Sequence, residues 1–364
     1  MSLQPRSAYG RRFRAGRASM VVVMLALLLA ATFFGTSGRS DGFAGRMGFV
    51  YRDGDRLMLN GAPYRFIGVN NYDLTGCHTG EPVSESDADM FFAQLPPHSM
   101  TRVWAFENYG IEGVEQTVRL ADKHGQKLIL VLADGAGYCG APNFDAAWYK
   151  QGFRSSYFDW AARLATSFKD SQAVAIWELM NEPGSGVDNL SLSVIKQFYD
   201  ATAVHIKQID SSHLVSTGAL APWQTFQEGV AGYAEAHSGQ DIDVVSIHEY
   251  DYPHSNGRTI ISPHFDTARE AAQAVGKPVY VGETGVSLTN GCMSAAERAE
   301  VLRQKFDAYL AAGAAGVLYW NVQGPPNDPG TVCNSVYGTS DPMLGGAIMN
   351  MISDYWQMPG YAVR

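Results

Sequence analysis

The chain has 364 residues, of which 46% are hydrophobic and 17% charged, and its formal net charge is −9. This is an ordinary globular composition, with enough length for one large core or for two domains of modest size. The mild acidic excess, without a basic stripe in the body of the chain, argues against a nucleic-acid partner.

Residues 1–37 have the composition of a signal peptide or signal anchor. Five arginines precede an apolar run from Met20 to Phe34 that only Thr32 interrupts. The run suits a signal core better than a membrane span, which needs ~20 apolar residues. No clean A-x-A cleavage site follows, so cleavage and membrane anchoring are both open. We expect a secreted or cell-envelope protein, with a Gly-rich linker at residues 38–47.

The first elements of the body form a hairpin and a buried strand. Asp53-Gly54 and Asn60-Gly61 lie between short apolar runs, and such dipeptides are strong hairpin signals. The strand at residues 64–69 then ends in Asn70-Asn71-Tyr72.

From there, apolar runs alternate with helical patterns. The pattern predicts further strands at residues 100–106, 127–132, 173–178, 214–217, 243–250, 278–283 and 316–321. Helices are expected at 85–95, 112–124, 154–168, 189–209, 225–237, 268–275 and 294–312, with a short one at the carboxy terminus. Eight strands with intervening helices predict an α/β fold, a single (β/α)8 TIM barrel spanning 48–364 behind its short hairpin. A doubly wound sheet would usually carry a glycine-rich phosphate turn, which this sequence lacks.

Polar and aromatic residues collect where the predicted strands end, which is the active-site face of such barrels. They are Asn70, Asn71, Arg102, Trp104, Asp134, Asn181, Glu182, His248, Tyr250, Glu283, Trp320 and Asn321. Two carboxylates stand out, Glu182 after strand four and Glu283 at the end of strand seven. Paired carboxylates ~5–5.5 Å apart support retaining glycoside hydrolysis, and a ~6.5–9.5 Å gap supports inversion. Arg102 is placed to keep the nucleophile charged, and Tyr250 to donate a hydrogen bond to it.

Five motifs carry a family resemblance. WELMNEP from Trp177, VGETG from Val281, HEY from His248, TRVWAF from Thr101 and LYWN from Leu318 resemble the strand-end motifs of glycoside hydrolase family 5. The resemblance covers the chain from Gly48 onward and implies a clan-A retaining enzyme that needs no cofactor or metal ion.

The resemblance also implies roles for individual residues. Glu182 would be the acid/base and Glu283 the nucleophile, while Asn181 would contact the sugar 2-hydroxyl. Arg102 and Tyr250 would order the nucleophile, His248 would support the acid/base, and Trp320 would form the floor under the scissile sugar. Asn71 and Trp104 complete the expected substrate-binding set. The chain departs from common family members at Asp134, where a His or Asn is usual, and at Thr284, where a Phe is usual.

Structural roles compete with functional ones at several positions. Trp104 and Trp177 are better explained as core residues, or as residues behind the site, than as sugar platforms. Glu178 is explained by an ion pair, and Glu249, which faces away from His248 and Tyr250, by a structural role. His248 has no second ligand at metal-binding spacing, and His213 is expected at the surface. The four cysteines, none in a C-x-x-C pair, predict two disulfides. Pairing of near neighbours, Cys77–Cys139 and Cys292–Cys333, would rigidify the rim of the cleft.

The motifs after strands one, two and four look most like the β-mannanase branch. We therefore expect a monomeric endo-β-1,4-mannanase acting on a polysaccharide or oligosaccharide, with a cellulase-like β-1,4-glucanase as the nearest alternative. A wall-remodelling transglycosylase and a non-hydrolytic carbohydrate-binding barrel also remain open.

Overall fold

A computed structural model describes residues 47–77, 79–222, 228–250, 260–286, 294–322 and 346–358. The predicted signal segment, nearly all of the linker, and the Cys292–Cys333 pairing lie outside these residues. None of the described helices is both long and apolar enough to cross a membrane.

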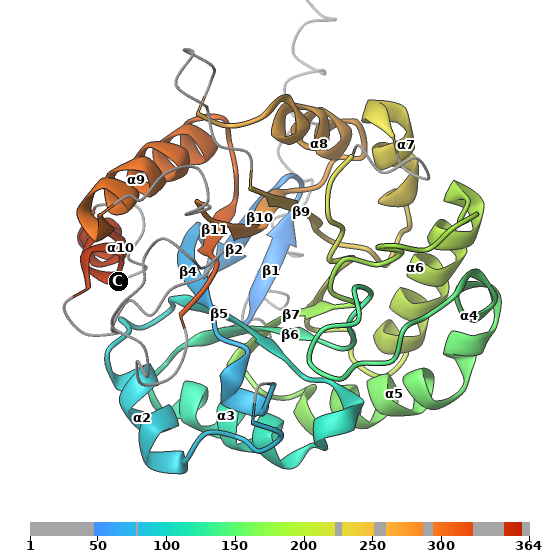
Figure 1. The fold of residues 1–364 in the computed structure, drawn as a ribbon, viewed down its shortest axis with the longest axis horizontal. Helices are drawn as coiled ribbons and strands as arrows, with labels where there is room; N and C mark the ends of the chain where they lie inside the picture. Colours follow the sequence, from blue (N-terminus) through green and yellow to red (C-terminus); the bar gives the residue numbers. More distant parts are fainter. Residues whose placement is uncertain are drawn as a thin grey trace, which may run out of the picture. The chain divides into compact units, whose positions relative to one another are not determined.

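Eight parallel strands form the centre of the fold (Figure 1). In chain order they are β4 (Phe66–Asn70), β5 (Met100–Trp104), β6 (Lys127–Val131), β7 (Val174–Glu178), β8 (Leu214–Ser216), β9 (Val245–Glu249), β10 (Val279–Thr284) and β11 (Gly316–Tyr319). Neighbouring strands pair from β8 through β4 to β11 and on to β9. A parallel bridge between Ser216 and Val244 joins β8 to β9, so the expected (β/α)8 barrel is confirmed.

The helices surround the strands (Figure 1). They are α2 (Glu85–Ala93), α3 (Glu112–Lys123), α4 (Ala146–Lys150), α5 (Ser156–Phe168), α6 (Leu192–Lys207), α7 (Gly229–Ala236), α8 (Pro263–Ala274), α9 (Ala295–Ala311) and α10 (Ala347–Gln357), with 3-10 turns η1 (Asp73–Thr75), η2 (Glu107–Tyr109) and η3 (Gly152–Arg154). Local chemistry sets their ends: Ser294 and Glu297 form a capping box at α9, and Gly125, at φ 67°, follows α3.

Besides the three short 3-10 turns, two elements were not predicted. The first is α4, which begins where Asp145 accepts a hydrogen bond from the Trp148 amide at 2.8 Å. Its five residues are too few to show a helical period. The second is β3 (Ala62–Pro63), which pairs with β2 (Arg56–Leu59) and extends the predicted hairpin, β1 (Val50–Asp53) and β2, to a three-stranded antiparallel sheet.

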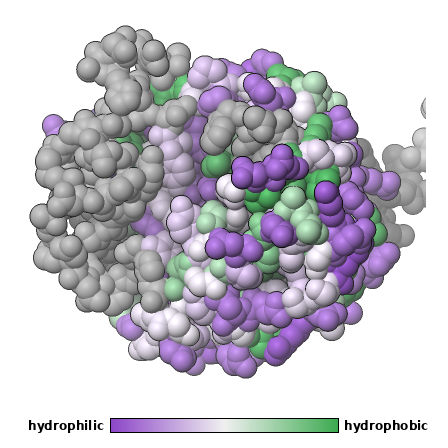
Figure 2. All heavy atoms as spheres, turned by 45° about the vertical axis from the view of Figure 1, so that its right-hand side comes forward, coloured by the Kyte–Doolittle hydropathy of each residue, from purple (hydrophilic) through white to green (hydrophobic). Residues whose placement is uncertain are grey.

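The core has two main layers. One lies between the strands and the surrounding helices. The other joins Val50, Leu57 and Leu59 of the small sheet to barrel residues such as Met100 and Ile129. The small sheet therefore packs against the amino-terminal part of the barrel, and the opposite strand ends are left for the polar residues. Hydrophilic side chains cover much of the coloured surface in Figure 2, with small apolar areas between them.

Candidate active site

A cavity of about 520 Å³ lies at the carboxyl ends of the strands. Its walls combine polar and aromatic side chains from seven segments of the chain. The lining residues are Tyr72, Cys77, Trp104, Tyr138, Cys139, Asn181, Glu182, Tyr250, Glu283 and Trp320. This is the mouth that the sequence predicted, and both candidate carboxylates line it.

Glu182 is held by its backbone just after β7. Its amide donates to the carbonyl of Gly218 at 3.0 Å, and its φ is 45°, which is uncommon for a residue with a side chain. Gly218 lies so close that a Cβ there would be 1.8 Å from the carbonyl oxygen of Met180. The contact therefore requires glycine at position 218.

Glu283 is almost fully buried at the end of β10. One carboxylate oxygen accepts from the Arg102 guanidinium at 2.7 Å, and the other accepts from the Tyr250 hydroxyl at 2.6 Å. Both donors stabilise the ionised form of this carboxyl. These are the two contacts that the sequence analysis anticipated.

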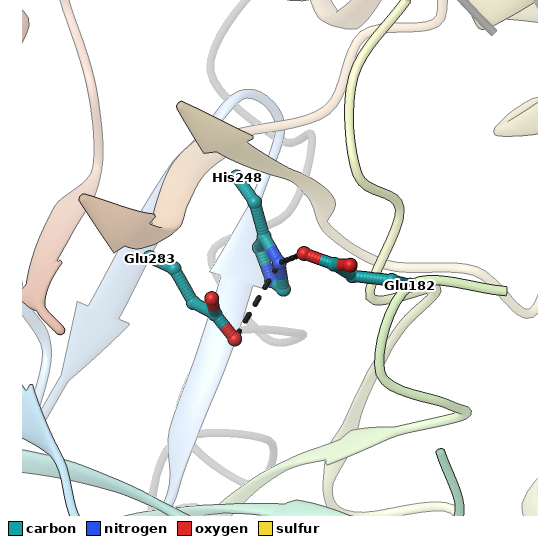
Figure 3. Close-up of side chains that lie close together, drawn as sticks. All are labelled: Glu182, His248 and Glu283. Carbon is teal, nitrogen blue, oxygen red and sulfur yellow. Dashed lines mark hydrogen bonds and ion pairs between the residues drawn. The ribbon is translucent and has the colours of Figure 1, made fainter. Parts of the chain in front are cut away.

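His248 lies between the two glutamates (Figure 3). Its Nδ1 is 2.9 Å from an oxygen of Glu182 and 3.5 Å from an oxygen of Glu283. The three atoms lie within 4.8 Å of one another, which is close enough for them to hold a metal ion together. This possible ligand set was not predicted, because the three residues come from different strand ends and show no local spacing in the sequence.

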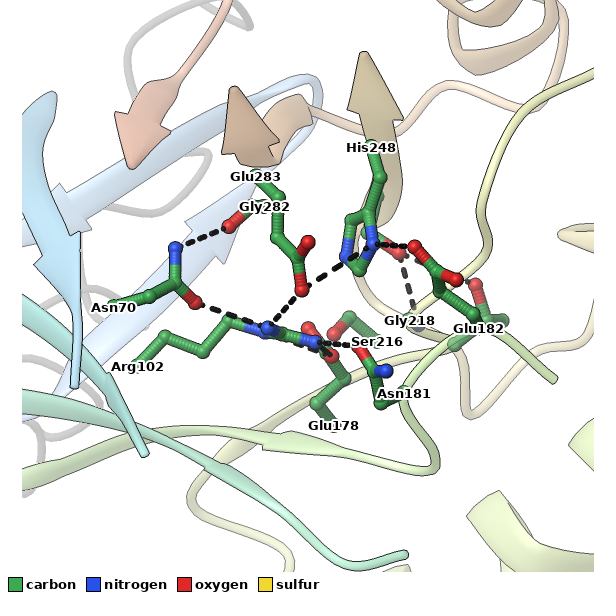
Figure 4. A network of polar contacts seen from close by, with 12 residues as sticks. Asn70, Arg102, Glu178, Asn181, Glu182, Ser216, Gly218, His248, Gly282 and Glu283 are labelled. Atoms are coloured by element: carbon green, nitrogen blue, oxygen red, sulfur yellow. Dashed lines mark hydrogen bonds and ion pairs between the residues drawn. The ribbon is translucent and has the colours of Figure 1, made fainter. Parts of the chain in front are cut away.

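Arg102 lies at the centre of a network of polar contacts (Figure 4). Besides Glu283, its guanidinium donates to Glu178 at 3.0 and 2.5 Å, to Asn70 at 2.9 Å and to Asn181 at 2.8 Å. The predicted ion-pair role of Glu178 is thus confirmed. One buried cation, Arg102, thus pairs with two buried carboxylates, Glu178 and Glu283.

Burial raises the pKa of the two glutamates and lowers the pKa of the histidine, because it disfavours the charged form of each group. Loss of solvent raises the pKa of Glu182 to about 7, although Arg102 acts against this. It also raises the pKa of Glu283, opposed by His248, Arg102 and Tyr250. Burial lowers the pKa of His248 to about 4, so its imidazole is neutral at neutral pH.

The remaining predicted residues divide into two groups. Trp320 and Trp104 line the cavity, where Trp104 stacks on Tyr72 and is only 3% exposed. Asn71 is buried, and its side chain accepts from the amide of Asp73 at 3.2 Å instead of lining the cavity. Its neighbour Asn70 has joined the Arg102 network.

Trp177, Glu249 and His213, for which roles other than substrate binding were predicted, all lie outside the cavity lining. Trp177 is buried away from the cavity, where its indole donates to Asp210 at 2.7 Å. Glu249 forms a buried ion pair with Lys305 at 3.0 Å, as expected for a structural residue. The surface placement of His213 was wrong: it is fully buried and bonded to Asp210, because its ring caps the core beside Trp177.

The part of the cavity wall formed by Tyr138 was not predicted from the sequence. Tyr138 has 59% of its surface exposed and lines the cavity from the segment after β6. The next residue, Cys139, forms the expected disulfide with Cys77, with a Cα–Cα distance of 4.9 Å. The disulfide and the aromatic side chain beside it therefore form one continuous part of the wall.

The comparisons with known proteins agree with this geometry. The family model for cellulase (glycosyl hydrolase family 5) matches residues 97–324. The chain belongs to glycosyl hydrolase family 5. It is a glycoside hydrolase, and both candidate glutamates lie inside the matched range.

Individual relatives of this family 5 protein cover most of its length. Mannan endo-1,4-beta-mannosidase 3 of Arabidopsis thaliana is 25% identical over 83% of this chain and 87% of its own. Mannan endo-1,4-beta-mannosidase 1 of Oryza sativa subsp. japonica is 25% identical over 87% of this chain and 88% of its own. The solved endo-1,4-beta-mannanase from Rhizomucor miehei has the same fold, with a TM-score of 0.65 and 18% identity over 85% of this chain and all of that one.

Proposed function

We propose that this family 5 hydrolase is a retaining endo-β-1,4-mannanase, with Glu283 as nucleophile and Glu182 as acid/base. The observation that carries the mechanism is the separation of the two carboxyl groups, whose facing oxygens lie within 4.8 Å. That distance suits direct attack on the sugar, because an inverting pair stands ~6.5–9.5 Å apart to admit a water molecule.

The first step breaks the glycosidic bond. The Glu283 carboxylate attacks the anomeric carbon, and Glu182 transfers its proton to the departing oxygen, which yields a glycosyl ester on Glu283. Arg102 and Tyr250 hold the attacking carboxylate in place. With a pKa of about 7, Glu182 still carries its proton near neutral pH, as a general acid requires.

The second step releases the sugar. Glu182, now ionised, accepts a proton from water as the water oxygen attacks the anomeric carbon and the ester bond to Glu283 breaks. The neutral imidazole of His248 lies 2.9 Å from Glu182 and orients it through both steps. Two inversions restore the original anomeric configuration.

Aromatic and amide side chains supply the sugar contacts. Trp320, Trp104 and Tyr138 line the cavity, and aromatic faces stack well on the apolar faces of sugars. Asn181 also lines the cavity and would bond the 2-hydroxyl of the sugar that Glu283 attacks. Asn71 follows Asn70, which belongs to the Arg102 network, and does not line the cavity. It would affect sugar binding only by holding the end of β4 in place.

Mannan is the favoured polymer because the matched relatives are themselves named mannanases. One structural relative, a Rhizomucor miehei mannosidase, was solved with mannosyl-fructose. A β-1,4-glucanase is the alternative, favoured by the cellulase description of the family model. The Cys77–Cys139 disulfide favours an oxidising compartment and hence export, as the arginine-rich amino terminus also suggests.

A substrate panel with two variants tests this proposal. Reducing sugar should be released from β-mannan faster than from cellulose or xylan, and Glu283→Ala should lose the activity on every substrate. Glu182→Ala should lose it on mannan but keep most of the first step on an aryl β-mannoside whose leaving group needs no proton. Equal activity of parent and Glu283→Ala would refute the mechanism, and a preference for cellulose would refute the substrate.

A further inference from the structure

Asp134 is a buried carboxylate beside the catalytic pair that the mechanism above does not use. It follows β6 and has no exposed surface. One of its oxygens accepts from the side-chain amide of Asn181 at 2.7 Å, and the other accepts from the backbone amide of Tyr138. With both oxygens bonded inside the protein, Asp134 has no surface with which to contact a sugar.

The side chain of Asn181 is held from both ends. Its oxygen accepts from the guanidinium of Arg102 at 2.8 Å, and its nitrogen donates to Asp134. A guanidinium only donates and a carboxylate only accepts, so the amide cannot turn over without losing both bonds. Among the described residues, nothing accepts from the second N–H of Asn181, which lines the cavity next to Glu182.

The backbones support the same arrangement. The amide of Asn181 donates to the carbonyl of Ala133 at 2.8 Å, and the amide of Gly135 donates to the carbonyl of Asn181 at 2.7 Å. These bonds form a bridge between the ends of β6 and β7. Asp134 and Asn181 are thus paired by their main chains as well as by their side chains.

We propose that Asp134 is a positioning residue, which holds the Asn181 amide so that its free N–H meets the sugar 2-hydroxyl. The inference rests on the proposed function, since it takes the hydroxyl of a bound sugar as the partner. With two acceptor oxygens and no donor, the ionised carboxylate accepts from Asn181 and from Tyr138 at once.

Asp134→Asn is the informative variant, because it keeps the size and removes one acceptor. Its amide oxygen will take the bond from Tyr138, and its NH₂ will then face the NH₂ of Asn181. We expect kcat/KM on an aryl β-mannobioside to fall about 10²-fold, as for a misplaced contact near the reacting atoms. On the counterpart with a 2-deoxy sugar in the attacked position, the same variant should lose less than about threefold, because the contact is already absent.

A double variant separates orientation from folding. In Asp134→Asn/Asn181→Asp the new amide donates to the new carboxylate, which still accepts from Arg102, and the net charge is unchanged. We expect the melting temperature to return toward that of the parent while activity stays low, because no N–H remains for the sugar. A double variant no more stable than Asp134→Asn would overturn the paired arrangement, whatever the substrate.

Asp210→Asn is the matched control. Asp210 is also a buried carboxylate, but it bonds Trp177 and His213 and does not line the cavity. It should lower the melting temperature and change kcat/KM by one common factor on both substrates. Equal losses on both substrates for Asp134→Asn would overturn the positioning role while leaving the proposed function intact. A parent inactive on both would refute the proposed function and this inference together.

Discussion

At the scale of single residues, the two carboxyl groups are distinguished by their partners. Glu283 accepts from a guanidinium and a phenol, whereas Glu182 faces only a neutral imidazole among the described side chains. The first environment favours a charged nucleophile and the second an acid that keeps its proton. The proposed roles therefore agree with the donors around each group.

The pH dependence of kcat/KM should report this difference. Activity on mannan needs Glu182 protonated, so it should fall as pH rises through about 7. It needs Glu283 ionised, so it should also fall on the acid side, at a pH above the usual value of 4.5. With an aryl mannoside that needs no protonation, the alkaline fall should disappear. Its persistence on that substrate would show that another group titrates there.

Arg102 should be irreplaceable by lysine. An ammonium cannot reach Glu178, Glu283, Asn70 and Asn181 together, so Arg102→Lys leaves at least one buried carboxylate poorly compensated. We expect the free energy of unfolding to fall by about 3–5 kcal/mol, and most of the activity to be lost. Urea denaturation measures the change in the free energy of unfolding.

Arg119→Lys gives the comparison, since Arg119 pairs with Glu85 at the surface, 3.0 Å apart and both more than half exposed. It should change stability by less than about 1 kcal/mol. Equal losses for the two arginines would contradict the role given to the buried network.

At the scale of elements, the hydrophobic repeat of the sequence predicted the strands and the long helices. It did not predict the short or irregular elements. The five-residue α4 and the two-residue β3 are set by Asp145 and by the turn at Gly61, not by a hydrophobic repeat. The early start of α8 did carry a signal, Ser262 capping with Pro263 in the first turn. The residues of loops could be predicted as polar, but not their partners. Asn71 accepts from the amide of Asp73, and His213 is bonded both to Asp210 and to the distant carbonyl of Ser171.

The segment after β6 offers a prediction at this scale. The Cys77–Cys139 bond closes a loop with a sequence separation of 62 and supports the wall that carries Tyr138. Replacing both cysteines with serine should cost about 4 kcal/mol, by the entropy of loop closure. The KM for mannan should rise more than kcat falls.

Treatment with a reductant shows whether the effect on KM comes from the Cys77–Cys139 disulfide or from another bond. It should raise the KM of the parent and leave that of the Cys77→Ser/Cys139→Ser variant unchanged. If both respond alike, the effect belongs to a different part of the molecule.

At the scale of the whole molecule, the barrel explains why residues from distant parts of the sequence act together. Parallel strands end on one face, so Arg102, Glu182, His248 and Glu283 converge from β5, β7, β9 and β10 (Figure 4). The order of the motifs was enough to predict that convergence and the family. It was not enough to predict the Arg102 network or the pairing of Asp134 with Asn181, since both depend on how side chains meet across the barrel.

Covalent trapping tests the central claim most directly. A 2-deoxy-2-fluoro-β-mannosyl fluoride should form the glycosyl ester quickly and release it slowly, because fluorine destabilises both transition states. Mass spectrometry of the digested protein should find one added sugar on the peptide that carries Glu283. A label on a different residue, or no label while mannan is cleaved with inversion of the anomeric centre, would contradict the account.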